Sequence, residues 1–213
     1  MFNFILIAVH FFSYFTTCLF YFIKDIKLFY RINAECEWNA VKLQKYRTDL
    51  LDIWSNALEN SFTNIMVSSI FILFLPSHQV SYIKSILNIP LYIVLVDCLF
   101  YFIHKILHKV PCLYKYHKQH HSTKLVVAPN GLDADIYEHI FLNIGSIFIP
   151  YIILGFSNSF MVIYVCYASF SAASSHSGYK HSIRHNLHHQ YTNVNYGTGF
   201  YIMDRLFGTF KST

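Results

Sequence analysis

The sequence predicts an all-α integral membrane protein, with about four to five membrane helices and a histidine-rich cap on the cytosolic side. Of its 213 residues, 54% are hydrophobic and only 13% are charged. A soluble domain of this length covers its core with many more charges, so we expect lipid to solvate much of this surface. The formal charge of +5 comes from Lys and Arg residues that lie between apolar runs. This placement is typical of membrane-flanking charge and argues against nucleic acid as a partner.

The first apolar run, residues 2–23, is long enough to cross a bilayer. A cleavable signal peptide would carry basic residues before a shorter apolar core, and small residues at a cleavage site. Here the positive charges follow the run, at Lys24, Lys27 and Arg31. This order predicts a retained helix whose C-terminal end faces the cytosol. Residues 25–60 mix charges with aromatic residues, which indicates an interfacial helical segment, with a soluble helical linker as the alternative.

Four further apolar runs are expected to pair into two membrane hairpins. The runs are residues 61–75, 86–103, 140–155 and 159–175. A hairpin returns the chain to the side that it left, so the segments after both hairpins are expected at the same, cytosolic face. We therefore divide the chain into an N-terminal helix with its interfacial segment, residues 1–60, and a second domain at residues 61–213.

Ten of the chain's 13 histidines gather in three places, where they form the patterns HxxxH, HxxHH and HxxHH or lie close to the last of these. The ten are His104, His108, His117, His120, His121, His176, His181, His185, His188 and His189. Residues three and four apart share one face of a helix, so each cluster projects its imidazoles in one direction. Imidazole is a good ligand for iron, zinc, copper and nickel, and ten donors exceed what one ion takes, which predicts two metal ions. His10 and His78 lie outside the clusters and are expected to be ordinary polar residues, whereas His139, next to Glu138, is intermediate.

Two helical stripes support this interpretation. Asp97, Tyr101, His104 and His108 fall at i, i+4, i+7 and i+11, and the last cluster makes a similar stripe from His181 if that segment is helical. An acid inside an apolar run is costly unless it is paired, so Asp97 is expected to accept a hydrogen bond from a ligand imidazole. The alternative is a pair with a lysine or tyrosine that serves packing alone.

These motifs resemble the fatty acid hydroxylase/sterol desaturase superfamily of integral-membrane oxygenases. Residues 97–104 resemble the helix that enters its first histidine box, residues 113–121 its second box, and residues 138–143 the start of its next hairpin. Its C-terminal signature is similar to residues 176–179, 184–189, 195–197 and 204–209. The resemblance begins at about Trp54, and it implies that residues 61–213 form a fatty acid hydroxylase-like catalytic domain. Within the superfamily, the motifs are most similar to those of C4-methylsterol oxidases, cholesterol 25-hydroxylase and C5-sterol desaturases.

The resemblance implies two non-haem iron ions, molecular oxygen, and electrons from NADPH or NADH through cytochrome b5 or a similar donor. It also implies an endoplasmic-reticulum membrane and hydroxylation or desaturation of a lipid that enters from the bilayer. A sterol is the leading substrate, and a fatty acid or sphingolipid is the alternative. In this interpretation Asp97 and Glu138 orient imidazoles, and Tyr179 and Asn195 support the site. A lipid slot could be lined by Phe71, Phe74, Phe100, Tyr151 and Tyr164.

The sequence departs from the superfamily pattern at two points. Asp135 stands where many relatives have histidine, and the connection from His176 to His185 is short, so His181 is expected to replace a ligand found further along in relatives. If His181 points away, the chain could instead be a metal-binding membrane protein that has lost its chemistry, with zinc as one candidate ion. A bis-histidine haem electron carrier is a further alternative. It would need facing histidine pairs at mid-membrane, whereas these histidines lie at predicted helix ends.

Overall fold

The computed structural model describes residues 1–35, 40–78, 80–122 and 126–212, and for residues 28–35 and 40–49 it describes the backbone alone. Within these ranges all regular structure is helical, which confirms the all-α prediction. The long helices are α1 (Phe2–Glu35), α2 (Ala40–Leu73), α3 (Tyr82–Lys109), α6 (Gly145–Leu154) and α7 (Asn158–Ser175). The short elements are α4 (Pro111–His117), η1 (Ala128–Gly131), α5 (Ile136–Glu138), η2 (His139–Ile144), η3 (Lys180–Ser182), α8 (Ile183–Tyr191) and α9 (Ile202–Leu206).

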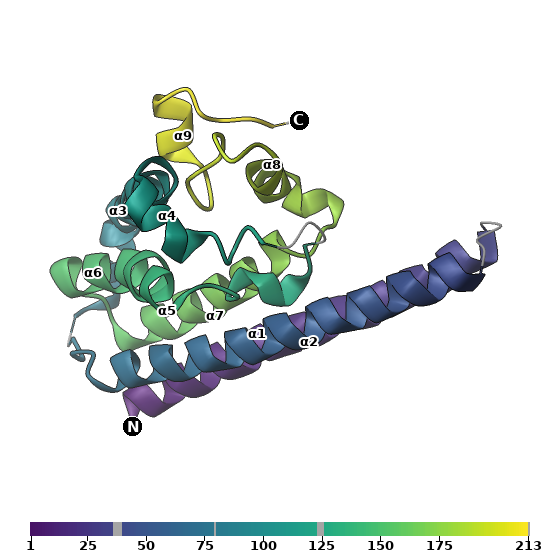
Figure 1. Ribbon diagram of the computed structural model, residues 1–213. Coiled ribbons are helices and arrows are strands. Elements are labelled where there is room, and N and C mark those ends of the chain that lie inside the picture. The colour runs from purple at the N-terminus through teal and green to yellow at the C-terminus, as the bar shows by residue number, and fades with distance from the viewer. Residues whose placement is uncertain (36–39, 79, 123–125, 213) are drawn as a thin grey trace.

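Helices α1 and α2 lie side by side and are the longest elements of the fold (Figure 1). The prediction of a separate short apolar helix at residues 61–75 is wrong, because these residues continue a helix that begins at Ala40. The preceding residues include good helix formers, and neither glycine nor proline interrupts the segment, so nothing in the chain ends the helix before Leu73. The predicted interfacial segment is therefore divided between α1 and α2, and its Trp38 lies outside the described residues.

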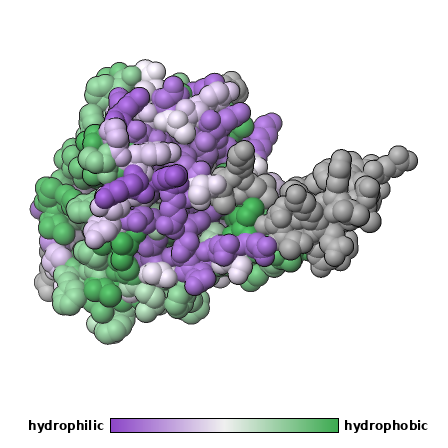
Figure 2. All heavy atoms as spheres, in the orientation of Figure 1, coloured by the Kyte–Doolittle hydropathy of each residue, from purple (hydrophilic) through white to green (hydrophobic). Residues whose placement is uncertain are grey.

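Three helical stretches are long and apolar enough to cross a membrane: Phe2–Lys27, Tyr82–Lys109 and Ile136–Leu154. The first of them coincides with the predicted N-terminal membrane helix, which stays a prediction. Helix α7 and the C-terminal half of α2 are not among these three stretches, so the count of four to five membrane helices stays a prediction. Hydrophobic residues gather along the left and lower edges of the face in Figure 2, and hydrophilic ones over its centre and upper part. Large apolar side chains such as Ile83 and Leu87, each 73% exposed, suit contact with lipid.

The buried apolar residues join the N-terminal helices to the rest of the chain. One cluster brings Leu6 of α1 and Ile72 of α2 together with residues of α3, α6 and α7. A second cluster packs Tyr14 and Trp54 against Leu132 and residues near it. Residues on both sides of position 60 thus share cores, and the domain boundary placed there stays a prediction.

The connection between α6 and α7 is the tight turn that the sequence predicts for the second hairpin. Gly155 has a φ of 68°, in the left-handed region that favours glycine, and Ser157 caps α7 by accepting from the amide of Phe160. On this hairpin α7 runs back along α1, where His10, Ser13 and other polar side chains bond to it. The chain after α7 therefore lies near the C-terminal end of α3 and near α4, which gathers the histidine patterns in one region (Figure 1).

Candidate metal centre

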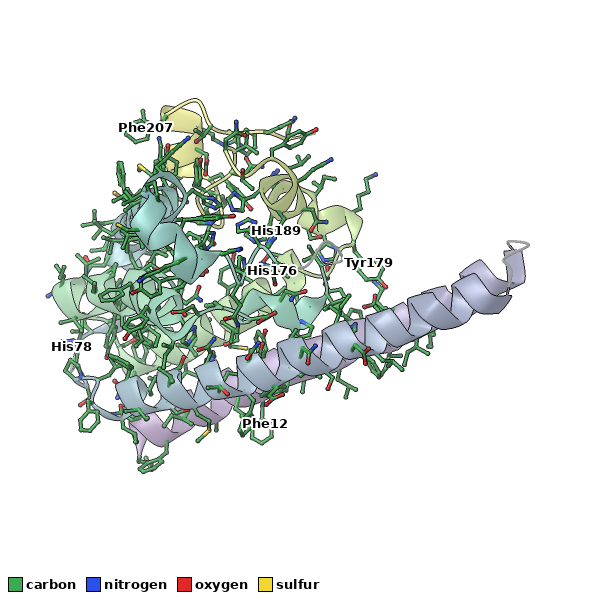
Figure 3. The ribbon with its side chains drawn as sticks, in the orientation of Figure 1. Phe12, His78, His176, Tyr179, His189 and Phe207 are labelled. Carbon is green, nitrogen blue, oxygen red and sulfur yellow. The ribbon has the colours of Figure 1, made fainter. Side chains whose placement is uncertain are left out.

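Nine of the ten predicted histidines converge in two groups, each within reach of one ion. The five-histidine cluster contains His104, His108, His117, His121 and His188, and the four-histidine cluster contains His120, His176, His185 and His189. Within each cluster the candidate ligand atoms all lie within 4.8 Å of one another. Figure 3 shows His176 and His189 close together in the middle of the molecule, between α7 and α8, with ring centroids 5.3 Å apart.

Each histidine doublet is divided between the two clusters. His120 joins the four-histidine cluster and His121 the five-histidine cluster, and His189 and His188 are divided in the same way. Consecutive side chains point in different directions, so a doublet supplies one ligand to each of two neighbouring positions. The rings of His121 and His189 lie 4.5 Å apart, which places the two clusters side by side. The histidines thus form two separate groups of donors, each of which could hold a metal ion.

The imidazoles point the same atom, Nε2, at one another. In the five-histidine cluster the Nε2 atom of His117 lies 3.0, 2.9 and 3.0 Å from those of His104, His108 and His121. In the four-histidine cluster the Nε2 atoms of His120 and His176 lie 3.1 Å apart. Several nitrogen atoms of one kind therefore crowd around a common point in each cluster.

The opposite nitrogen, Nδ1, is held by backbone carbonyl groups in four of the rings. His104 donates to the carbonyl oxygen of Tyr196 at 2.7 Å, and His188 to that of Val194 at 2.8 Å. His176 donates to Ala172 at 2.9 Å, and His120 makes a longer contact of 3.3 Å with Asp133. A carbonyl oxygen can only accept, so each of these rings carries its proton on Nδ1 and leaves a lone pair on Nε2.

This assignment means that the close Nε2 contacts lack a proton to bridge them. In neutral His120 and His176, two lone pairs face each other across 3.1 Å. A proton on one ring would relieve the repulsion, but burial and the neighbouring imidazoles lower the pKa of both histidines. A metal cation relieves it without protonation. The donor set therefore fits bound metal.

The spacing of the donors also suits metal binding. At a metal–nitrogen distance of about 2.1 Å, ligands at right angles lie about 3.0 Å apart, whereas tetrahedral ligands lie about 3.4 Å apart. The Nε2 atoms that contact one another are separated by 2.9–3.1 Å. Nitrogen atoms at this separation can be ligands of one ion in each cluster.

We expect acid to destabilise the metal-free protein through these histidines. Burial lowers the pKa of His117 to about 3, below its value of about 6.5 in an unfolded chain. The folded state thus holds fewer protons, so this contribution to stability is complete above about pH 6.5 and is lost as the pH falls towards the folded-state pKa. Each such histidine lowers the free energy of unfolding by up to about 1.4 kcal/mol per pH unit in that window.

Thermal unfolding of chelator-treated protein between pH 7.5 and 5 measures this effect. The unfolding temperature of the wild-type protein should fall steadily as the pH is lowered. The unfolding temperature of the His117→Gln protein should fall less steeply, because the amide of glutamine cannot take up a proton. An unfolding temperature that stays constant across this range would contradict the assignment of neutral, buried imidazoles.

Two buried carboxylates hold the loop that positions His104 and His188. Asp97 of α3 accepts from the backbone amides of Thr198 at 2.9 Å and Met203 at 2.8 Å. Asp204 accepts from the amides of Tyr196 at 2.9 Å and of Gly197. The expectation that Asp97 accepts directly from a ligand imidazole is therefore replaced by an indirect link: the carboxylate fixes the loop, and the loop carbonyl of Tyr196 accepts from His104. Asp204 was assigned no role from the sequence, although an acid within the C-terminal motif at residues 204–209 was the available signal.

The other predicted supporting residues lie at different distances from the clusters. Oε2 of Glu138 lies 2.9 Å from Nδ1 of His117, and the predicted role of this carboxylate in orienting an imidazole stays a prediction. Asn195 is fully buried and joins the C-terminal segment to α8 by donating to the carbonyl groups of Arg184 and Lys211. The hydroxyl of Tyr179 donates to Asp25 on α1, and Figure 3 shows Tyr179 to the right of His176 and His189, away from the clusters.

His181 lies outside both clusters, contrary to its prediction as a ligand. Its Nε2 atom lies 2.8 Å from the hydroxyl of Tyr21, and its side chain is exposed. The predicted stripe fails because Lys180–Ser182 form a 3₁₀ turn, so His181 is out of phase with His185 on α8. The short connection still brings His176 and His185 together, with ring centroids 4.1 Å apart. Asp135 accepts from the amide of Tyr137 and caps α5.

A cavity of about 300 Å³ runs from the membrane helices to the four-histidine cluster. Val96, Phe100 and Tyr164 line its apolar part, and His176 and His185 line its far end. Phe100 and Tyr164 were predicted to line a lipid slot. Of the other predicted residues, Tyr151 is fully buried in the core, and Phe71 and Phe74 are exposed.

A model of the fatty acid hydroxylase family matches residues 89–209, which is more than half of the chain and includes both histidine clusters. The chain belongs to the fatty acid hydroxylase family. A similar protein is the fatty acid hydroxylase vlmA of a Lecanicillium species, which is 26% identical in an alignment 192 residues long; the alignment covers 73% of this chain and 52% of the relative. The chain therefore spans about half the length of that relative. No solved structure matches it.

Proposed function

We propose that this fatty acid hydroxylase-family chain is a membrane-bound, iron- and oxygen-dependent oxidoreductase that hydroxylates or desaturates a lipid. The observation that carries the proposal is the convergence of nine Nε2 atoms in two groups, one of which borders the cavity that leads from the membrane helices. Two bound iron ions would supply the activation of molecular oxygen that removal of hydrogen from an unreactive C–H bond requires. NADPH or NADH would supply electrons through cytochrome b5 or a similar donor.

The chain's own contribution is to hold the ligands and to exclude water. Carbonyl groups fix four of the imidazoles with Nε2 free, and Glu138 orients His117. Asp97 and Asn195 act through the C-terminal loop, which they tie to α3 and α8. Tyr179 acts from outside the clusters, through its bond to Asp25.

A lipid is the substrate that the surroundings favour. Phe100 of α3, Ile147 of α6 and Tyr164 of α7 give the cavity of about 300 Å³ apolar and aromatic walls. Such walls suit the rings of a sterol, our leading candidate, and also a fatty acyl or sphingolipid chain. Lys24 and Lys27 near the C-terminal end of the first membrane span support a cytosolic position for the clusters, in a membrane that we take to be the endoplasmic reticulum.

The second candidate function is a metal-binding membrane protein without oxygenase activity. His181 lies outside the clusters and Asp135 caps a helix, so both departures from the family pattern remove a possible ligand. The nine remaining histidines nevertheless supply four and five donors. We favour the oxygenase because these donors suffice for two ions without either residue.

Metal content tests the proposal. Protein purified without oxygen from iron-supplied cells is expected to hold two irons per chain. His120→Ala should lose the iron of the four-histidine cluster, whereas the matched variant His181→Ala should keep both irons. Absence of iron that persists after reconstitution would contradict the proposal and favour the inactive metal-binding protein, as would bound iron without oxygen consumption in the presence of lipid and reductant.

A further inference from the structure

A second cavity, of about 70 Å³, lies among the apolar helices, with residues of α1, α2, η2, α6 and α7 in its lining. Its walls include the apolar residues Ile72, Phe148 and Val165. One histidine, His10, also lines it, from within the span Phe2–Lys27. An ionisable residue at this depth is costly, which makes it a candidate for function.

The hydrogen bonds of His10 define which of its nitrogens is free. Ser169 donates its hydroxyl to the carbonyl oxygen of Val165 at 2.7 Å, as serines in helices commonly do. The hydroxyl oxygen of Ser169 lies 2.8 Å from Nδ1 of His10, and because its own proton goes to Val165, it accepts the proton that Nδ1 carries. Nε2 of His10 is then an acceptor. This atom is buried and has no hydrogen-bond partner among the described residues.

The other polar side chains around the cavity already satisfy one another. Asn143 donates to Nδ1 of His139, which leaves the proton of that ring on Nε2, 2.7 Å from the hydroxyl oxygen of Ser68. A water molecule needs two to four polar partners to be held in a cavity. Here one unpaired acceptor faces apolar walls, and this suits a group with one hydrogen-bond donor and an apolar body better than it suits water.

The small cavity adjoins the cavity of about 300 Å³ that borders the four-histidine cluster, which we take as the lipid slot. Asn143, Ile147, Ala168 and Ala172 line both spaces. His10 contacts Ser169, which precedes His176 by seven residues of chain, so about 10 Å of helix separates the acceptor from the four-histidine cluster. A ligand that reaches from the slot into this cavity would present one end to each.

We propose that His10 Nε2 accepts a hydrogen bond from a hydroxyl group of the lipid substrate, at the end of that lipid which lies away from the histidine clusters. The inference rests on the proposed function, and it defines the substrate as a lipid alcohol. A sterol or a long-chain alcohol carries such a group. The earlier expectation that His10 is an ordinary polar residue is replaced by this proposal.

Equilibrium binding of two pairs of radiolabelled probes tests it, with detergent-solubilised protein that keeps its own metal and receives no reductant. The pairs are cholesterol with its methyl ether, and 1-octadecanol with its methyl ether. The wild-type protein should bind one alcohol about five- to tenfold more tightly than its ether, since the ether cannot donate to a buried acceptor. That pair identifies the class of lipid.

Three variants locate the effect. His10→Phe should bring the ratio of affinities to about one, and the matched variant His78→Phe, on the connection between α2 and α3, should leave it at the wild-type value. Ser169→Ala, a smaller change that covers the case of a poorly folded His10→Phe, removes the partner that fixes the proton on Nδ1 and should lower the ratio.

Equal affinities for alcohol and ether in the wild-type protein would overturn the proposal, and so would an unchanged ratio in the His10→Phe and Ser169→Ala proteins. The result is independent of turnover. Selective binding of an alcohol by a protein that neither holds iron nor consumes oxygen would refute the oxygenase and leave the hydroxyl site in place.

Discussion

Replacement of His188 by alanine is expected to abolish oxygen-dependent oxidation of lipid, with a loss of more than about 100-fold. His188 belongs to the five-histidine cluster, where its Nε2 atom lies 3.1 Å from those of both His108 and His121. Its Nδ1 atom also donates to the carbonyl oxygen of Val194, so the variant loses a donor and a tie to the C-terminal loop. Product formation in membranes, with lipid and reductant supplied, measures the effect.

The metal content of the same variant adds a sharper expectation. His188→Ala should weaken iron binding at the five-histidine cluster, which keeps four donors but loses the tie to the C-terminal loop, and should leave the four-histidine cluster loaded, so fewer than two but at least one iron per chain should remain. His78→Ala, far from both clusters in Figure 3, is the matched control and should keep full activity and both irons. Full activity in His188→Ala protein that is still inserted in membranes would exclude the five-histidine cluster as part of the reaction centre.

The variant Gly197→Ala is expected to destabilise the protein by about 3 kcal/mol, although the residue is neither a ligand nor in a left-handed conformation. A Cβ atom at this position would lie 2.6 Å from Oδ1 of Asp97 and 2.8 Å from Oδ2 of Asp204. Both carboxylates are buried and accept from loop amides, so neither can move without loss of hydrogen bonds. The loop would shift, and with it the carbonyl group of Tyr196 that orients His104.

Thermal unfolding together with iron analysis checks this prediction. Gly197→Ala should unfold several degrees below the wild type and bind less iron. Gly145→Ala is the matched control, because the nearest atom to its added Cβ is 3.4 Å away, an ordinary contact, and its stability should be unchanged or slightly higher. Wild-type stability and iron content in Gly197→Ala would show that the loop tolerates the displacement of these carboxylates.

Several features of this protein were determined by the sequence alone, since they depend on local spacing. Apolar run lengths identified an all-helical membrane protein, and helical periodicity placed Asp97, Tyr101, His104 and His108 on one stripe. All four lie on α3, and Asp97, Tyr101 and His104 are buried. The histidine patterns and the motifs around them identified the family that the comparison confirms. Each of these inferences needs only the order of residues in one segment.

The tertiary structure alone decided which atoms meet. The division of each doublet between two clusters depends on how α3, α4, α7 and α8 approach one another, which no local spacing encodes. His181 has the spacing of a ligand, but a 3₁₀ turn rotates it towards Tyr21. The partners of Asp97 lie about a hundred residues further along the chain, in the C-terminal loop. The unpaired acceptor of His10 exists because Ser169, on another helix, holds the proton of the opposite nitrogen. In each case the function of a side chain depends on a neighbour distant in the sequence, and folding alone brings the two together.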